Sequence, residues 1–388
     1  MAKRVIWIIL DSVGIGEAPD ADKFDDLGAD TLGHIYERKR EEGFSLPNLE
    51  KLGLGMIDGV NPSIGKTDSP KGIYLKCAEK SAGKDTTIGH WEMTGIITPK
   101  PFPTFPDGFP KDVIDEFIAE CKVPGVLGNK VASGTEIIKE LGSEHIRSGK
   151  PIVYTSADSV YQIACHTDVY PIEQLYAMCE KARHILQGEN AVARVIARPF
   201  AGNEGEYYRT SDRRDFSLKP NENNLLVHLK NNGIPVFAVG KIEDIFAGVG
   251  ISEAVHTKNN MDGVDKTIEY MKNKKEECLI FTNLVEFDST WGHRRDVEGY
   301  AKGLADFDDR LGKIMELMGE DDLLVINADH GCDPTYKGTD HTREFIPVLM
   351  YGKNIAPANA HTGDTFANIG ATIGKYFGVD IPAGREVF

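Results

Sequence analysis

An α/β fold with a mostly parallel central sheet is predicted by three apolar runs, each of which leads into an aspartate. The runs cover residues 5–10, 278–287 and 323–328, and the aspartates that follow them are Asp11, Asp288 and Asp329. Uninterrupted apolar runs are typical of strands buried on both faces, as the strands of parallel sheets are. Helical and strand-like segments alternate along the rest of the chain, which is the pattern of the α/β class.

Cap and turn residues mark the elements between these runs. Helices are expected over residues 135–141, 172–186, 297–318 and 365–377, and further strands over residues 151–155, 192–197 and 235–239. Pro171 suits the start of the second helix. Ser133 and Asp364 are candidate N-caps, and Gly142 and Gly378 are candidate helix stops.

The composition of the chain limits its number of domains, its partners and its location. The chain has 388 residues, enough for two domains, and its formal net charge of −16 disfavours nucleic acid and anionic membranes as partners. Six scattered cysteines without paired spacing favour a reducing, cytoplasmic location. The apolar run near the N-terminus stops at Asp11, which is too short for a signal peptide or a membrane span.

The distribution of residue types predicts a core domain interrupted by an inserted cap. Acids and histidines suited to metals lie only in the first and last portions of the chain, whereas arginines cluster in the middle. A proline-rich stretch at residues 98–103 marks the entry to the middle portion. We therefore expect a metal-binding catalytic core over residues 1–99 and 220–388, and a cap over residues 100–219.

A divalent-metal site is predicted at the carboxyl ends of the strands, where open α/β sheets bind their ligands. The candidate ligands are Asp11, Asp288, His293, Asp329, His330 and His341. Carboxylates and imidazoles without cysteine suit hard-to-borderline cations, and six ligands suit two metals, as in phosphoryl-transfer sites. Any one pair, such as Asp329 with His330, could instead cap a helix. We leave His90 and His166 out of the ligand set.

A hydroxyl nucleophile is predicted in the segment GKDTTIGHWE at residues 83–92. Glycine followed by a short polar run before a helix would place Thr86 or Thr87 where helix N–H groups stabilise phosphate oxygens. A threonine hydroxyl needs a metal or a base to become nucleophilic. The alternative is that either threonine is only the N-cap of the helix.

Seven segments resemble the bacterial phosphopentomutases of the alkaline phosphatase superfamily. They are DSVGIGEAPD at 11–20, GKDTTIGHWE at 83–92, YTSADSV at 154–160, RVIARPF at 194–200, NLVEFD at 283–288, GHRRD at 292–296 and GTDHTRE at 338–344. The resemblance covers essentially the whole chain, including the expected cap. It implies an alkaline-phosphatase-like core with an inserted α/β cap.

The resemblance also implies a mechanism and a set of functional residues. The family interconverts ribose 1-phosphate and ribose 5-phosphate, and their 2-deoxy forms, through a phosphothreonine and a bisphosphate intermediate. It typically uses two Mn²⁺ ions, with Zn²⁺ or Mg²⁺ as alternatives, and a sugar bisphosphate activates it.

By this resemblance, each residue has an expected role. Thr86 would be the nucleophile; Asp11, Asp329 and His330 would hold one metal; Asp288, His293 and His341 would hold the other; and Asp158, Arg194, Arg209 and Lys241 would bind the pentose phosphate. The chain departs from the family pattern at Thr87 and at Glu286, and strand alternation would turn Glu286 to the same face as Asp288.

Two rival functions remain open at this stage. A metal-dependent phosphatase or a phosphoglycerate-type mutase would share the core and differ in the cap, so a panel of substrates would separate them. A non-catalytic sensor of sugar phosphates would keep the metal ligands but would respond unchanged after Thr86→Ala.

Overall fold

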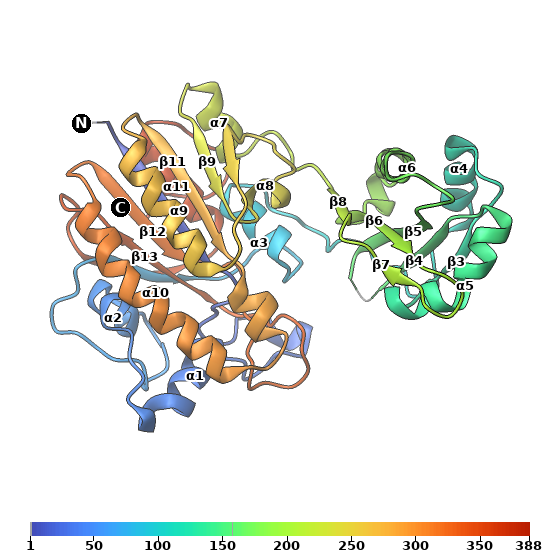
Figure 1. Ribbon diagram of the computed structural model, residues 1–388. Coiled ribbons are helices and arrows are strands. Elements are labelled where there is room, and N and C mark those ends of the chain that lie inside the picture. Colours follow the sequence, from blue (N-terminus) through green and yellow to red (C-terminus); the bar gives the residue numbers. More distant parts are fainter. Residues whose placement is uncertain (1, 157) are drawn as a thin grey trace. The chain divides into compact units, whose positions relative to one another are not determined.

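The computed structural model describes residues 2–156 and 158–388 and divides the chain into two compact units. Unit 1 comprises Met1–Lys100 and Pro220–Phe388, and unit 2 comprises Pro101–Lys219. The chain therefore leaves unit 1 once, forms unit 2, and returns (Figure 1).

Unit 1 is built on an eight-stranded sheet. Its strands, in spatial order, are β10 (Glu253–Val255), β9 (Val236–Val239), β11 (Cys278–Leu284), β1 (Arg4–Leu10), β12 (Asp322–Asn327), β13 (Ile346–Tyr351), β2 (Ile73–Cys77) and β14 (Ala358–Gly363). The first five strands pair in parallel, β13 is antiparallel to both of its neighbours, and β14 is parallel to β2. The sheet is thus mostly parallel.

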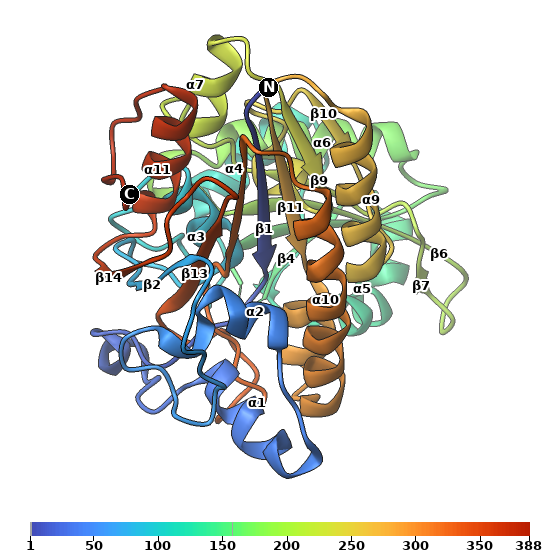
Figure 2. The same cartoon turned by 90° about the vertical axis from the view of Figure 1, so that its left-hand side faces the viewer.

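Helices cover both faces of this sheet. The helices of unit 1 are α1 (Thr31–Lys39), α2 (Pro47–Leu52), α3 (Thr86–Met93), α7 (Leu225–Asn231), α8 (Ile242–Ile245), α9 (Asn260–Asn273), α10 (Val297–Leu317) and α11 (Ala367–Phe377). Helices α9 and α10 lie on one face, and α3, α7 and α11 lie on the other (Figure 2). Short turns of 3-10 or π geometry are η1 (Ala21–Phe24), η2 (Arg40–Glu42), η3 (Leu54–Met56) and η5 (Phe287–Gly292).

Strand β1 lies at the centre of the sheet, between β11 and β12, and every residue of it is buried. Trp7 stacks on Phe281 of β11 with ring centroids 4.2 Å apart. The pairing is in register to the strand ends, with Leu10 opposite Leu284. Because the three strands are parallel and aligned, their carboxyl ends come to one edge of the sheet.

Unit 2 has a six-stranded sheet and its own apolar core. Its elements are α4 (Lys111–Cys121), β3 (Leu127–Val131), α5 (Gly134–Ser148), β4 (Ile152–Thr155), β5 (Val160–His166), α6 (Ile172–Ile185), η4 (Gly188–Asn190), β6 (Arg194–Ala201), β7 (Tyr208–Arg209) and β8 (Arg214–Ser217). The strand order is β3-β4-β5-β6-β7, with β8 paired to β6. Phe109, Phe117 and Tyr161 pack together in its core.

The predicted fold class is confirmed, but two helix boundaries were predicted wrongly. Helix α5 runs through Gly142 to Ser148, because Gly142 lies against the ring of Tyr207, where an added Cβ would come within 2.6 Å of a ring carbon. The Ser133 side chain does not cap this helix.

Helix α11 begins at Ala367, and Asp364 does not cap it. The hydroxyl of Thr365 accepts a hydrogen bond from the Ala367 N–H instead, at 3.1 Å, and the Glu92 carboxylate accepts one from Phe366 N–H at 2.9 Å. The start of α11 is therefore fixed to α3, which carries Glu92. Among the residues that the structure describes, no helix combines the length and the apolar character needed to cross a bilayer.

Candidate metal centre beside Thr86

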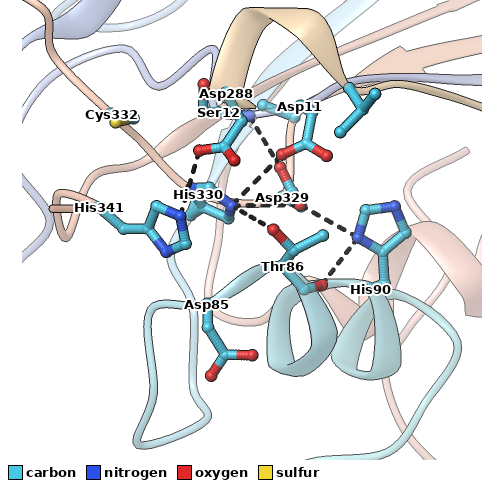
Figure 3. Close-up of polar contacts among 12 residues, drawn as sticks. Asp11, Ser12, Asp85, Thr86, His90, Asp288, Asp329, His330, Cys332 and His341 are labelled. Atoms are coloured by element: carbon cyan, nitrogen blue, oxygen red, sulfur yellow. Dashed lines mark hydrogen bonds and ion pairs between the residues drawn. The ribbon is translucent and has the colours of Figure 1, made fainter. Parts of the chain in front are cut away.

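Three aspartates converge at the carboxyl ends of β11, β1 and β12 (Figure 3). Asp11 follows β1 directly, Asp329 lies two residues beyond β12, and Asp288 lies in the π turn η5. Asp288 is therefore not on a strand, and the expectation that alternation turns Glu286 toward the same face is wrong. Glu286 is in a helical conformation, and its carboxylate accepts a hydrogen bond from the Asn260 N–H at 2.7 Å.

The turn after β1 connects Asp11 to Asp329 through the backbone of Ser12. Ser12 has a φ of 69°, in the left-handed region that residues other than glycine rarely adopt. Its N–H donates to Asp329 Oδ1 at 2.9 Å. Such a conformation costs on the order of 1–3 kcal/mol and persists where the surroundings enforce it, commonly at functional sites. Here it directs a backbone donor onto a candidate ligand.

The first group of candidate ligands is Asp11, Asp329 and His330. His330 Nε2 lies 3.4 Å from Asp11 Oδ1 and 3.4 Å from Asp329 Oδ2, whereas Nδ1 donates to the Gly331 carbonyl at 3.0 Å. Burial alone would lower the pKa of His330, but the Asp329 and Asp11 carboxylates raise it well above its usual value. A metal bound at Nε2 requires the neutral imidazole, so a metal would compete with a proton there.

The second group is Asp288, His293 and His341. Asp288 Oδ1 lies 3.1 Å from His341 Nε2 and 3.4 Å from His293 Nε2, and the two Nε2 atoms are 3.1 Å apart. His293 Nδ1 donates to the Thr339 carbonyl at 2.6 Å, which directs Nε2 toward Asp288. The Asp288 carboxylate beside it raises the pKa of His293 to about 9. Burial would raise the pKa of Asp288, but His341 and His293 hold it well below its usual range.

Three buried carboxylate oxygens test whether these residues fit cations. Asp11 Oδ1, Asp288 Oδ1 and Asp329 Oδ2 are all buried and accept no hydrogen bond. Buried carboxylate oxygens in native proteins are nearly always hydrogen-bonded or bound to metal. One such oxygen on each aspartate, with imidazole Nε2 atoms beside them, is the donor set expected around divalent cations. The residues therefore fit metal ions.

Cys332 lies beside the second group, which the sequence pattern did not anticipate. Its thiol is one of three groups, with Asp288 and His293, close enough to hold an ion. However, the sulfur faces His293 Nδ1, at 3.9 Å, and that nitrogen already donates to Thr339. His341 Nε2 lies 3.1 Å from Asp288 Oδ1, so we keep His341 as the third candidate ligand of this group.

Helix α3 begins at Thr86, and Asp85 is its N-cap. Asp85 Oδ1 accepts hydrogen bonds from the N–H groups of Thr87 at 3.0 Å and Ile88 at 3.1 Å. Neither threonine is therefore the N-cap, and the alternative that Thr86 or Thr87 serves only as a cap is excluded. Asp85 thus occupies these two N–H groups. The Thr86 hydroxyl lies 3.1 Å from His330 Nε2.

His90 connects α3 to the ligands, although we left it out of the ligand set. Its Nδ1 lies 2.9 Å from the Thr86 carbonyl and 3.1 Å from Asp329 Oδ2. Its Nε2 lies 3.3 Å from Asn283 Nδ2, which also donates to Asp11 Oδ2 at 2.8 Å. His90 and Asn283 thus orient the aspartates of the first group. The spacing of four residues from Thr86 on one helix face is the signal that could have indicated this role.

Comparisons with known proteins identify the family of this chain. The sequence profile of the metalloenzyme superfamily matches residues 3–381. A phosphopentomutase of Clostridium novyi (strain NT) is 58% identical over 381 residues, covering 98% of this chain and 96% of that one. One of Clostridioides difficile (strain 630) is 56% identical over 388 residues, covering 99% and 98%. The chain belongs to the phosphopentomutase family.

Membership of the phosphopentomutase family confirms the resemblance seen in the sequence and makes the chain an isomerase-type enzyme, a phosphotransferase mutase. The metalloenzyme superfamily to which it belongs implies that the enzyme depends on metal. Among solved structures, a protein of Pyrococcus horikoshii aligns with 99% of this chain and 100% of its own, at 13% identity and a TM-score of 0.50. That likeness concerns the fold alone.

The four residues expected to bind the pentose phosphate are divided between the units. Arg194 Nη2 in unit 2 lies 4.0 Å from Asp158, and its Nη1 lies 3.4 Å from Asp215. Arg209, also in unit 2, donates to the Thr135 hydroxyl at 3.2 Å. Lys241 lies in unit 1, exposed, at the N-terminus of α8. Ion pairs that are partly or fully exposed, as these are, contribute little to stability.

His166 was also left out of the ligand set. Its Nε2 lies 2.9 Å from the Gly202 carbonyl, and its Nδ1 accepts from the Asp168 N–H at 3.2 Å. It serves the packing of unit 2.

Proposed function

We propose that this enzyme interconverts ribose 1-phosphate and ribose 5-phosphate, and the 2-deoxy forms, through a phosphothreonine at Thr86. The observation that carries the proposal is the position of the Thr86 hydroxyl, 3.1 Å from His330 Nε2. This hydroxyl lies beside buried carboxylate oxygens that accept no hydrogen bond. The names of the relatives, at 53–58% identity, supply the substrate class.

The reaction consists of two phosphoryl transfers that mirror each other. Phosphorylated Thr86 gives its phosphoryl group to the free hydroxyl of the pentose phosphate, whose proton is released, and a pentose bisphosphate forms. The other phosphoryl group of the bisphosphate then passes to Thr86, and a proton returns to the sugar oxygen. Thr86 is phosphorylated again, and the phosphate has changed position on the sugar.

Each residue of the centre has a place in this proposal. Asp11, Asp329 and His330 would hold one cation, and Asp288, His293 and His341 the other. Bound cations would neutralise charge on the phosphoryl oxygens and lower the pKa of the Thr86 hydroxyl. We propose two Mn²⁺ ions, because three carboxylates make the donor set oxygen-rich, with Zn²⁺ or Mg²⁺ as alternatives.

Four further residues are proposed to bind the substrate. Asp158, Arg194, Arg209 and Lys241 would bind the pentose phosphate, since guanidinium groups bind phosphate oxygens in pairs. A sugar bisphosphate would act as the activator by phosphorylating Thr86. The free thiols of all six cysteines support the cytoplasmic location that we propose.

Phosphoryl labelling tests the proposal. Protein loaded with Mn²⁺ and incubated with glucose or ribose bisphosphate is expected to gain one phosphoryl group, located at Thr86 by peptide mass spectrometry. Thr86→Ala should remain unlabelled, and Thr87→Ala, the matched control, should be labelled. Label on Thr87 would move the nucleophile by one residue, and label on neither would exclude the covalent mechanism. Release of inorganic phosphate without isomerisation would favour a phosphatase.

A further inference from the structure

We propose that Arg343 is a positioning residue for phosphoryl transfer. Its guanidinium group holds the loop that leads into Thr86 (residues 78–85, here the Thr86 loop) against the loop that carries His341. This inference rests on the proposed role of Thr86. It assigns to Arg343 no contact with the substrate. Its effect is on where the Thr86 hydroxyl lies relative to His330 and His341.

The Arg343 side chain reaches the Thr86 loop through three backbone carbonyls. The side chain is 2% exposed. Nη1 donates to the carbonyl of Gly83, and Nη2 donates to the carbonyls of Glu79 at 2.8 Å and Ser81 at 2.9 Å. These carbonyls alternate along the segment that connects β2 to α3. One arginine therefore fixes the course of the chain up to three residues before Thr86.

Two carboxylates complete the surroundings of this guanidinium group. Glu79 Oε2 accepts from Nη1 at 2.5 Å, and Asp20 accepts from Nε at 3.0 Å and from Nη2 at 3.2 Å. All three guanidinium nitrogens, which together carry five N–H groups, thus have acceptors. A lysine, with three donors on a single atom, cannot reproduce this fan of contacts. The site is built for arginine.

The backbone of Arg343 is held as firmly as its side chain. Its N–H donates to Asp26 Oδ2 at 2.8 Å, and the same oxygen accepts from Lys84 Nζ at 2.9 Å. Its carbonyl accepts from the Ala18 N–H at 3.0 Å. Because Arg343 lies two residues after His341, any shift of the Thr86 loop relative to this anchor is a shift relative to a candidate ligand.

Other contacts hold the Thr86 loop on a different side. Glu92 accepts hydrogen bonds from the N–H groups of Lys80 and Ser81, and it also accepts from the Thr365 hydroxyl, which precedes α11. Loss of the Arg343 contacts would leave these bonds in place, so the loop would stay attached to α11 while its distance from the ligands relaxed. A displacement of about 1 Å can slow a reaction ~100-fold.

Arg343→Lys tests the inference, with Arg4→Lys as the matched control. Arg4 is also a buried arginine: Nε donates to Asp322 Oδ1 at 2.9 Å, and Nη1 donates to the Lys274 carbonyl at 3.0 Å, at the start of β1 and away from the ligands. With each variant loaded with Mn²⁺, the rate constant for phosphoryl transfer from bisphosphate to Thr86 is measured in a single turnover, with KM for the pentose phosphate and the metal content.

Arg343→Lys is expected to slow transfer to Thr86 by ~10- to 100-fold, with KM and metal content unchanged. Arg4→Lys is expected to lower the unfolding temperature and to leave the transfer rate as in the wild type. Transfer at the wild-type rate in Arg343→Lys, or a loss confined to KM or metal content, would overturn the inference. Label at a residue other than Thr86 in the wild type would instead overturn the proposed function.

A second variant keeps the test decisive if Arg343→Lys does not fold. Asp20→Ala removes two of the contacts to the guanidinium group while Glu79 and the carbonyls remain, and the Asp20 side chain is 30% exposed. Its transfer rate should be lower than the wild-type rate, by less than about tenfold. An unchanged rate in Asp20→Ala would count against Arg343 as a positioning residue.

Discussion

Glu344 shows how one buried carboxyl group can hold several loops around a site. Its Oε2 accepts from the N–H groups of Thr31 at 2.8 Å and Gly16 at 3.2 Å, and its Oε1 accepts from the hydroxyls of Thr31 and Thr342, both at 2.6 Å. An added Cβ on Gly14 would approach the carboxylate within 2.4 Å, so the space around it is closed. Burial raises the pKa of Glu344 to about 8.

Protein stability should therefore fall with rising pH through the range set by Glu344. The unfolded-state pKa is about 4.5 and the folded-state pKa about 8, so the native protein binds the extra proton between them. The contribution is fully present below pH ~4.5 and is lost as pH rises to ~8, at ~1.4 kcal/mol per pH unit. Glu344→Gln, whose amide can donate to both hydroxyls, should remove this slope in urea unfolding measured from pH 5 to 8. An equal slope in both proteins would contradict the assignment.

At the scale of elements, helix α3 brings the Thr86 hydroxyl to the candidate metal ligands. Gly89, in the first turns of this helix, lies so close to Asp329 that an added Cβ would be 2.3 Å from the Asp329 carbonyl oxygen. Since that neighbour is backbone, the helix itself would have to move. The approach of Thr86 to His330 depends on this contact between α3 and the end of β12.

Gly89→Ala should therefore destabilise the protein by roughly 1–3 kcal/mol through overpacking and should reduce phosphoryl transfer. Gly312 in α10 is the control, because its nearest neighbour atom would be 3.6 Å from an added Cβ. Gly312→Ala should stabilise by up to ~1 kcal/mol, from helix propensity, with activity retained. Thermal unfolding and the isomerase assay measure both effects. Similar behaviour of the two variants would show that the close approach of α3 is unimportant.

At the scale of the whole molecule, the two units differ in whether they carry candidate metal ligands. Every candidate metal ligand lies in unit 1, on segments at residues 11–12, 288–293 and 329–341. Unit 2 has a separate sheet and a separate apolar core. Metal binding should therefore stabilise one unit and leave the stability of the other unchanged.

Hydrogen exchange with and without metal checks this expectation. Mn²⁺ at about 100 times its Kd should add ~2.7 kcal/mol of protection per site. The increase should appear in residues 11–17, 288–293 and 329–344, and residues 101–219 should exchange as before. EDTA should reverse it. Equal protection of both units would mean that the metals stabilise the chain as a single cooperative body.

The sequence by itself determined the fold class and the edge of the sheet on which the aspartates meet. Both follow from local pattern: continuous apolar runs indicate doubly buried parallel strands, and the carboxyl ends of such strands share one edge. The family also followed from the sequence, since its motifs are contiguous segments. No knowledge of the packing was needed for these predictions.

Only the tertiary structure decided how the site is held together. Asp288 lies in a π turn and not on a strand, Asp85 caps α3 in place of a threonine, and Cys332 lies beside the second group. His90 and Arg343 gain their roles from partners in other segments of the chain. The physical reason is that these contacts depend on strand register and loop course, which arise when distant segments pack, whereas sequence pattern reports only on neighbours along the chain.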